Sequence, residues 1–181
     1  MLLGPPGSGK GTQGERLRED GFVSLATGDL LRDARAAGTG LGRRASEYMD
    51  RGDLVPDELI VAALEEALGD LDGKPVVLDG FPRTVAQAEA LAGALEAHDR
   101  ELTDVVLIDV PDDVVTERIG GRHQNREDDD PETVRERLRV YHGETEPLVK
   151  YYDERGLLRR VDGAGDADEV SAGVRAALDA R

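Results

Sequence analysis

The sequence predicts an α/β fold in which a parallel sheet carries helices on both faces. Short apolar runs alternate along the chain with segments of helical periodicity, the order expected of strand–helix–strand units. The runs are mostly apolar along their length, as in strands that are buried on both faces. A glycine-rich stretch, GPPGSGKGT, joins the first apolar run to the first helical segment. It therefore falls at the carboxyl end of a strand, where such sheets bind ligands.

Five strands and several helices can be placed from these patterns. The expected strands are Leu2–Leu3, Phe22–Leu25, Pro75–Leu78, Val105–Val110 and Leu157–Val161. A helix over Gly11–Asp20 follows the glycine-rich stretch, and Pro56 opens another whose first turn carries two acids. A long helix is expected over 131–155, because D-P-E is a start signal and Gly156 is a stop signal.

Two stretches interrupt the alternation of strands and helices. Residues 28 to about 54 carry two helical patterns with no strand between them, and residues 118–129 are short, polar and arginine-bearing. Both read as inserts over the carboxyl edge of the sheet. We therefore expect a single domain over 1–181, with a core of 1–26, 55–117 and 130–181 and inserts at about 27–54 and 118–129.

The composition excludes several classes of function. The net charge of −16 argues against binding to nucleic acid, whose phosphates would be repelled. With no cysteine there is no disulfide, thiolate zinc site or catalytic thiol. No apolar run reaches 18 residues and no secretory signal pattern opens the chain, so we expect a cytoplasmic protein that does not contact membranes.

The glycine-rich stretch is the strongest functional signal. It fits the phosphate loop G-x-x-x-x-G-K-[ST] at Lys10, except that Gly11 stands where a hydroxyl is expected and Thr12 follows one residue late. A disordered leader is the alternative, but the stretch lies between a strand and a helix, as the motif requires. Backbone amides and the helix amino terminus would bind phosphate there. The candidate phosphate-binding residues are Gly7, Ser8, Gly9, Lys10, Gly11 and Thr12.

A second motif is VVLDGFPRT, residues 76–84. Asp79 ends a buried strand and would bring a carboxylate to the same edge, as a partner for metal-bound water; alternatively it is a turn acid. Arg83 would point into the same cleft or into solvent. Thr84 and Gln87 satisfy a capping box, in which Gln87 would serve only the start of a helix.

Two further groups of residues carry both a structural and a functional interpretation. In ATGDLLR, either Thr27 or Asp29 could be a helix N-cap, and Arg32 could be exposed. Arginines at 118, 122, 126 and 137 could each be solvated surface charges, although the first two share a helix face. The guanidinium fork suits bidentate phosphate binding. Gathered in a cleft, such arginines would give it local positive charge despite the acidic exterior.

In combination the motifs resemble the nucleoside monophosphate kinases, and the adenylate kinases in particular. The matching patterns are G-x-x-G-x-G-K-G-T, T-G-D-x-L-R, D-G-F-P-R-x-x-x-Q, R-I-x-G-R, R-x-D-D and V-R-x-R-L, and the likeness runs from Gly4 to the V-D-G at 161–163. The resemblance implies a P-loop NTPase-type five-stranded parallel sheet with a helical AMP-binding insert and a short lid that lacks a zinc site. The first strand is shorter than is usual in the family.

The resemblance also implies an activity: reversible, Mg²⁺-dependent phosphoryl transfer, ATP + AMP = 2 ADP. The catalytic residues would be Lys10, Arg83, Arg118, Arg122, Arg126 and Arg137. Asp128 and Asp129 match acids that orient these arginines; alternatively they form an exposed acidic run. The donor nucleotide would contact the phosphate loop together with Arg118, Arg122 and Gly165. AMP would contact Thr27, Arg32, Asp53, Leu54, Val55, Gly80, Arg83, Gln87, Arg126 and Arg137. Asp79 would reach Mg²⁺ through water.

Other functions remain as alternatives. A uridylate/cytidylate kinase of the same family is one, although Thr27 and Gln87 match the AMP-specific pattern. A GTP-binding switch is disfavoured because the sole asparagine, Asn125, precedes Arg126 and cannot form N-K-x-D. A non-catalytic relative is disfavoured by the complete arginine set. We expect a monomer whose partners are ATP, AMP and ADP.

The charged residues lead to a prediction about salt. Twenty arginines, only three lysines and 22 aspartates suggest a surface suited to concentrated salt, rather than that of an ordinary acidic protein. At about 1 M salt the Debye length is about 3 Å, so repulsion among carboxylates would be screened. We expect the melting temperature to rise between millimolar and molar KCl. Circular dichroism measures this temperature. A melting temperature that falls as the salt concentration rises over this range would contradict the hypothesis.

Overall fold

The computed structural model describes residues 1–50, 55–69, 71, 73–120 and 131–179, and it contains the five expected strands. They are β1 (Leu2–Leu3), β2 (Val23–Ala26), β3 (Val76–Asp79), β4 (Val105–Asp109) and β5 (Leu158–Asp162). Each bound lies within one residue of the prediction, and every strand pair is parallel. The α/β class is therefore confirmed.

The strand pairing differs from a single five-stranded ladder. Within the described residues, hydrogen bonds join the strands into a two-stranded ladder, β2–β3, and a three-stranded ladder, β1–β4–β5. The strand β1 also lies beside β3. It has two residues, and the register Leu2↔Val106 and Leu3↔Leu107 engages both of them with β4.

A hollow of about 920 Å³ lies beside the amino end of β1. Leu2, Val77 and Val106 are among the residues that line it. The Met1 amine lies at its wall and donates a hydrogen bond to the Asp104 carbonyl oxygen at 2.8 Å. Burial lowers the pKa of this amine to about 6, against the opposing charge of Asp104.

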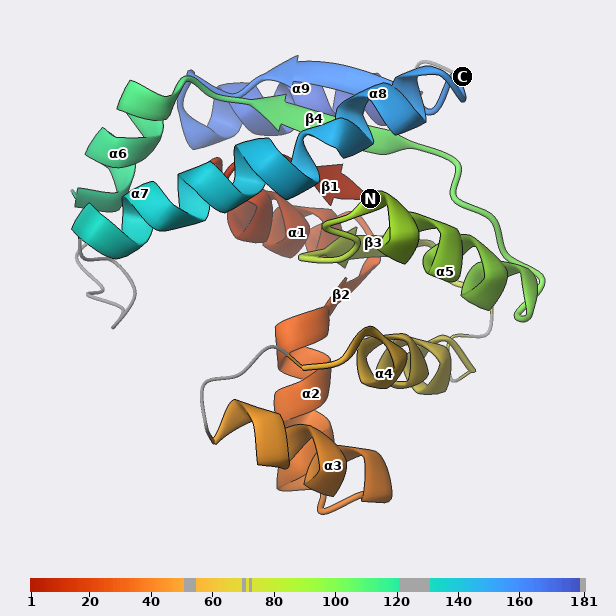
Figure 1. The fold of residues 1–181 in the computed structure, drawn as a ribbon. Coiled ribbons are helices and arrows are strands. Elements are labelled where there is room, and N and C mark those ends of the chain that lie inside the picture. Colours follow the sequence, from red (N-terminus) through yellow and green to blue (C-terminus); the bar gives the residue numbers. More distant parts are fainter. Residues whose placement is uncertain (51–54, 70, 72, 121–130, 180–181) are drawn as a thin grey trace.

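Helices cover both faces of the strands, as predicted (Figure 1). The α-helices outside residues 27–49 are α1 (Lys10–Glu19), α4 (Asp57–Gly69), α5 (Val85–Glu96), α6 (Asp112–Gly120), α7 (Pro131–Val140), α8 (Pro147–Asp153) and α9 (Ala167–Asp179). In the described part of the chain, none of the helices combines the length and apolar character needed to cross a bilayer.

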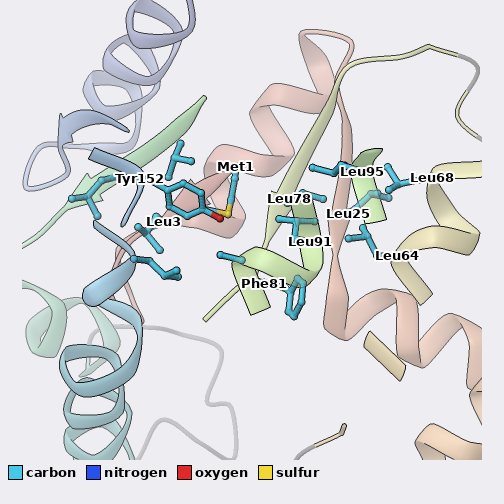
Figure 2. Close-up of a cluster of buried hydrophobic side chains, with 14 residues drawn as sticks. Met1, Leu3, Leu25, Leu64, Leu68, Leu78, Phe81, Leu91, Leu95 and Tyr152 are labelled. Carbon is cyan, nitrogen blue, oxygen red and sulfur yellow. The ribbon is translucent and has the colours of Figure 1, made fainter. Parts of the chain in front are cut away.

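Alternate strand residues supply two separate hydrophobic clusters. Leu3 and Leu107 pack with residues of α4, α5 and α8, whereas Leu2 and Ile108 pack with residues of α1, α6, α7 and α9. This division follows from the two-residue period of a strand. Figure 2 shows the first cluster, in which the ring of Tyr152 from α8 lies next to Met1. The strands are thus held from both sides.

The first predicted insert is a pair of helices that projects away from the strands (Figure 1). These are α2 (Thr27–Ala36) and α3 (Gly40–Met49), with no strand between them, as expected. They approach closely, because a Cβ on Gly42 would lie 2.1 Å from the Ala34 carbonyl oxygen. Leu31, Ala45 and Ala63 form a small core that attaches the pair to α4.

The long helix expected over 131–155 is interrupted. A π-helical turn, η1 (Tyr141–Thr145), separates α7 from α8. The amide of Glu146 donates to the Tyr141 carbonyl, five residues back, and Pro147 follows at the start of α8. Proline has no N–H to continue the α-helical ladder, and a wider turn accommodates that loss. The chain leaves α8 at Asp153, and Gly156 takes a positive φ of 70°.

The π-helical turn generates a prediction for pH. His142 places Nδ1 3.1 Å from Glu146 Oε2 and Nε2 3.0 Å from Asp112 Oδ2. Hydrogen bonds to these two carboxylates raise the pKa of His142 above 6.5. The stabilisation is therefore complete below pH 6.5 and is lost as the pH rises through the raised pKa. We expect His142→Gln to lower the melting temperature by about 1–2 °C at pH 6 and by much less at pH 9.

His98→Gln is the matched control for this measurement, because it makes the same replacement at a different place in the structure, beside Gly69 of α4. Its effect on the melting temperature should not follow the pattern of His142→Gln. Equal losses for His142→Gln at both pH values would contradict the prediction.

Candidate active site

The glycine-rich loop closes around the amine of Lys10. The loop follows β1, and α1 begins at Lys10 after Gly9, whose φ of 93° is left-handed. The Lys10 Nζ donates to the carbonyl oxygens of Gly4 and Pro5, both at 2.8 Å. A Cβ on Gly7 would lie 2.9 Å from Ile119 Cγ1, so a side chain there would collide with α6. The sequence thus places a half-buried cation at the amino terminus of a helix, within a turn of backbone amides.

The unusual Gly11 lies opposite the carboxylate that ends β3. A Cβ on Gly11 would be 4.0 Å from Asp79 Oδ2, and the hydroxyl-bearing Thr12 is exposed one residue further on. Burial raises the pKa of Asp79, while the charges of Lys10 and Arg83 oppose the increase. The carboxylate therefore lies next to the loop amine and is partly withdrawn from water.

A cleft of about 1010 Å³ opens at the carboxyl ends of β2 and β3. It brings together eleven of the predicted site residues, from the loop, α2, the end of β3 and α7. They are Gly7, Gly9, Lys10, Gly11, Thr12, Thr27, Arg32, Asp79, Gly80, Arg83 and Arg137. The sequence-based location of the site is therefore consistent with the hollow that the fold creates.

The charge of this cleft differs from that of the whole chain. Its described lining carries five cations (Lys10, Arg18, Arg32, Arg83 and Arg137) and four acids (Glu15, Asp29, Asp79 and Glu136). These charges nearly balance, against −16 for the chain. The expected positive cleft is thus a nearly neutral one where the structure describes it.

The start of α2 corrects both N-cap predictions. The N-cap position is Ala26, which provides no side-chain cap, and Thr27 is the buried first helical residue. Asp29 accepts a hydrogen bond from the Arg32 guanidinium three residues on. An acid within the first turn is stabilised there by the helix dipole, and here it also finds a cation. Arg32 is consequently held at the wall of the cleft.

The carboxamide of Gln87 is held at both ends. The Thr84 hydroxyl accepts from the Gln87 amide at 3.2 Å, which confirms the predicted cap. However, the Gln87 Oε1 accepts from the Arg83 amide at 2.7 Å, one residue earlier than a capping box requires. Its Nε2 donates to Asp57 Oδ1, also at 2.7 Å. The sequence indicated Asp57 only as an acid at a helix start, because its partner lies 30 residues away.

Gln87, Gly165 and several other predicted residues lie outside the lining of this cleft. Arg118 donates to the carbonyl oxygens of Ala164 and Gly165, at 3.0 and 2.7 Å. Val55 packs against the small core of the α2–α3 pair, and Ser8 is buried. Asp53, Leu54, Arg122, Arg126, Asp128 and Asp129 lie outside the described residues. Sequence reasoning missed Glu136 of α7 as a lining residue, and it missed Tyr141 and Thr145 because the π-helical turn that contains them was not foreseen.

A lysine in a glycine-rich loop, a strand-end carboxylate beside it and several arginines in one cleft define the class of the protein. It is a P-loop nucleotide phosphotransferase of the nucleoside monophosphate kinase type.

Comparison with known proteins identifies the family. The family model described as "Adenylate kinase" matches residues 2–157. An adenylate kinase of Thermus thermophilus is 53% identical over 181 residues, covering 98% of this chain and 95% of that protein. One of Xanthomonas oryzae pv. oryzae is 50% identical over 182 residues, covering 98% and 97%. One of Stenotrophomonas maltophilia is 48% identical with the same coverage. The chain belongs to the adenylate kinase family.

The partly buried Asp79 carboxylate predicts a change in stability. At neutral pH its ionised form is disfavoured by desolvation, so replacing it by a neutral amide should stabilise the ligand-free protein. We expect Asp79→Asn to raise the melting temperature by about 2–4 °C. Asp109→Asn is the matched control, because Asp109 is the exposed acid that ends β4. A lower melting temperature for Asp79→Asn than for the unchanged protein would contradict this account.

Proposed function

We propose that this protein catalyses the reversible transfer of a phosphoryl group between ATP and AMP, giving two ADP. The observation that carries the proposal is that one cleft contains both the Lys10 loop and the wall formed by Thr27, Arg32 and Arg83. Phosphoryl transfer needs two nucleotides held in line, with little covalent chemistry from the protein. A phosphate-binding loop facing a second cationic wall meets that requirement.

The glycine-rich loop is the proposed site of the phosphoryl donor, ATP. Its amides and the amino terminus of α1 favour an anion, and Lys10 would exchange two carbonyl partners for phosphate oxygens. A charged partner gives a stronger hydrogen bond than a neutral carbonyl does. We assign Gly7 through Thr12 to the donor phosphates, and Arg118 with Gly165 to the same nucleotide. Arg118 and Gly165 already pair with each other, which supports treating them as one unit.

The acceptor side is the wall formed by α2 and the end of β3. Arg32 and Arg83 would bind the phosphate of AMP through their planar forks. The base would contact Thr27 and Gln87. The remaining proposed contacts are Asp53, Leu54, Val55 and Gly80. The support is that Thr27, Arg32, Gly80 and Arg83 line the same cleft.

Four arginines are assigned to the group in transfer: Arg118, Arg122, Arg126 and Arg137. Donors aimed at the developing charge are a large source of rate enhancement in such reactions. Arg137 supports this assignment by lining the cleft from α7. The inserts at about 27–54 and 118–129 would close over the nucleotides and exclude water, which would otherwise hydrolyse ATP.

The cofactor proposed is Mg²⁺ bound with ATP, and no zinc. Mg²⁺ prefers oxygen ligands and usually keeps several waters beside substrate phosphates. Asp79 fits this role because it is a carboxylate at the loop, next to Lys10. When bound, the ion would neutralise phosphate charge, and Asp79 would hold one of its waters. We further propose a cytoplasmic monomer, for which the acidic, cysteine-free composition is the support.

A coupled assay of ADP formation tests the proposal. With ATP and Mg²⁺, AMP should be the preferred acceptor, by at least ~10²-fold in kcat/KM over UMP and CMP. A preference for UMP or CMP would instead indicate a uridylate/cytidylate kinase. No ADP from any acceptor would indicate a non-catalytic nucleotide-binding protein.

Replacement of the loop lysine should separate catalysis from folding. We expect Lys10→Ala to lower kcat by at least ~10²-fold, comparable to the loss of one oxyanion donor. Lys150→Ala is the matched control, because the Lys150 side chain is 82% exposed on α8. Near-normal turnover by a folded Lys10→Ala protein would contradict the assignment of Lys10.

A further inference from the structure

Two groups of opposite hydrogen-bonding character fix the orientation of the Gln87 carboxamide. The Arg83 amide can only donate, and it donates to Oε1 at 2.7 Å. The Asp57 carboxylate, when ionised, can only accept, and it accepts from Nε2 at 2.7 Å. A rotation of the amide by 180° would face donor with donor and acceptor with acceptor. One orientation is therefore strongly preferred.

This arrangement leaves Gln87 with unused hydrogen-bonding capacity. An amide has two N–H donors and two oxygen lone pairs, so one of each remains after the bonds to Asp57 and Arg83. A fixed donor–acceptor pair matches adenine, which presents an amino donor beside a ring-nitrogen acceptor. Uracil has a carbonyl acceptor in place of the amino group. It would therefore require the donor and the acceptor of the amide in the opposite order. The orientation of the amide therefore bears on which base is accepted.

We propose that Asp57 is a positioning residue for base selection: it fixes the amide of Gln87 so that the acceptor site prefers adenine over uracil. The inference rests on the proposed function, because it takes Gln87 as a contact of AMP. Asp57 is the first residue of α4, and Gln87 lies in the first turn of α5. The bond between them therefore joins the start of α4 to the D-G-F-P-R-x-x-x-Q segment.

If Asp57 only stabilised the folded protein, its replacement would affect the kinetics in a different way. Asp57 and Glu58 are both exposed acids in the first turn of α4, where either would interact favourably with the helix dipole. Of the two, Asp57 accepts the bond from Gln87. Glu58→Gln is therefore the control for charge and helix stability. A general loss of folded protein would lower the apparent kcat for every substrate without changing a KM.

The experiment compares Asp57→Ala, Asp57→Asn and Glu58→Gln in the coupled assay with AMP and UMP as acceptors. For Asp57→Ala we expect KM for AMP to rise about tenfold, the scale of a lost hydrogen bond to a charged group. The KM for ATP should stay within about twofold, and selectivity for AMP over UMP should fall. Asp57→Asn can still offer a carbonyl oxygen, so it should remain within about threefold of the unchanged protein. Glu58→Gln should have no effect on either acceptor.

A double-mutant cycle completes the test. Once Gln87→Ala has removed the amide, adding Asp57→Ala should not raise KM for AMP further. The inference is overturned if Asp57→Ala leaves KM for AMP and the selectivity unchanged, if Asp57→Asn is as impaired as Asp57→Ala, or if the effects of Asp57→Ala and Gln87→Ala add in full. In each case the unchanged protein still phosphorylates AMP. Failure of the unchanged protein to use AMP would instead overturn the proposed function.

Discussion

The position of the Lys10 amine is the interaction on which the site depends. Gly4 and Pro5 direct their carbonyl oxygens at this amine, and α1 begins at the same residue. The loop therefore has a defined shape before any phosphate arrives, with a positive charge and a helix amino terminus at its centre. Preorganised charge of this kind does not need to be rearranged during reaction, and this is why it is effective in catalysis. The other groups of the cleft are arranged around it.

The second constraint is the balance of charge in the cleft of a very acidic chain. Two effects on the ionisation of Asp79 oppose each other: burial disfavours the ionised form, and the charges of Lys10 and Arg83 favour it. Arg32 is held by Asp29, and Arg83 donates through Nε to the Gly80 carbonyl at 2.9 Å. These cations thus have local partners that keep them at the wall, and a phosphate would compete with those partners. Near the site, such short-range pairing limits the repulsion that a highly negative surface would exert on a bound phosphate.

Much of the fold could be predicted because its signals are local. Apolar runs, Pro56, Gly156 and the glycine-rich loop fixed the strands and helix ends to within a few residues. The five parallel strands are as predicted, although the two residues of β1 form a ladder with β4 and lie beside β3 without one. The uninterrupted long helix was predicted wrongly. The helix over 131–155 was predicted from the signals at its two ends, and these do not show that Pro147, which lacks an N–H, interrupts it.

The sequence by itself determined the phosphate loop, the order of strands and helices, and the edge of the sheet at which the site lies. Each depends on residues adjacent in the chain and on the rule that parallel strands end at one edge. Only the tertiary structure decided that Gln87 bonds to Asp57, that Arg118 holds Ala164 and Gly165, and that Tyr141 reaches the cleft. These contacts join residues 30 or more positions apart or follow a local change of helix type. Pattern and spacing carry no information about such distances, since they are set by how whole elements pack.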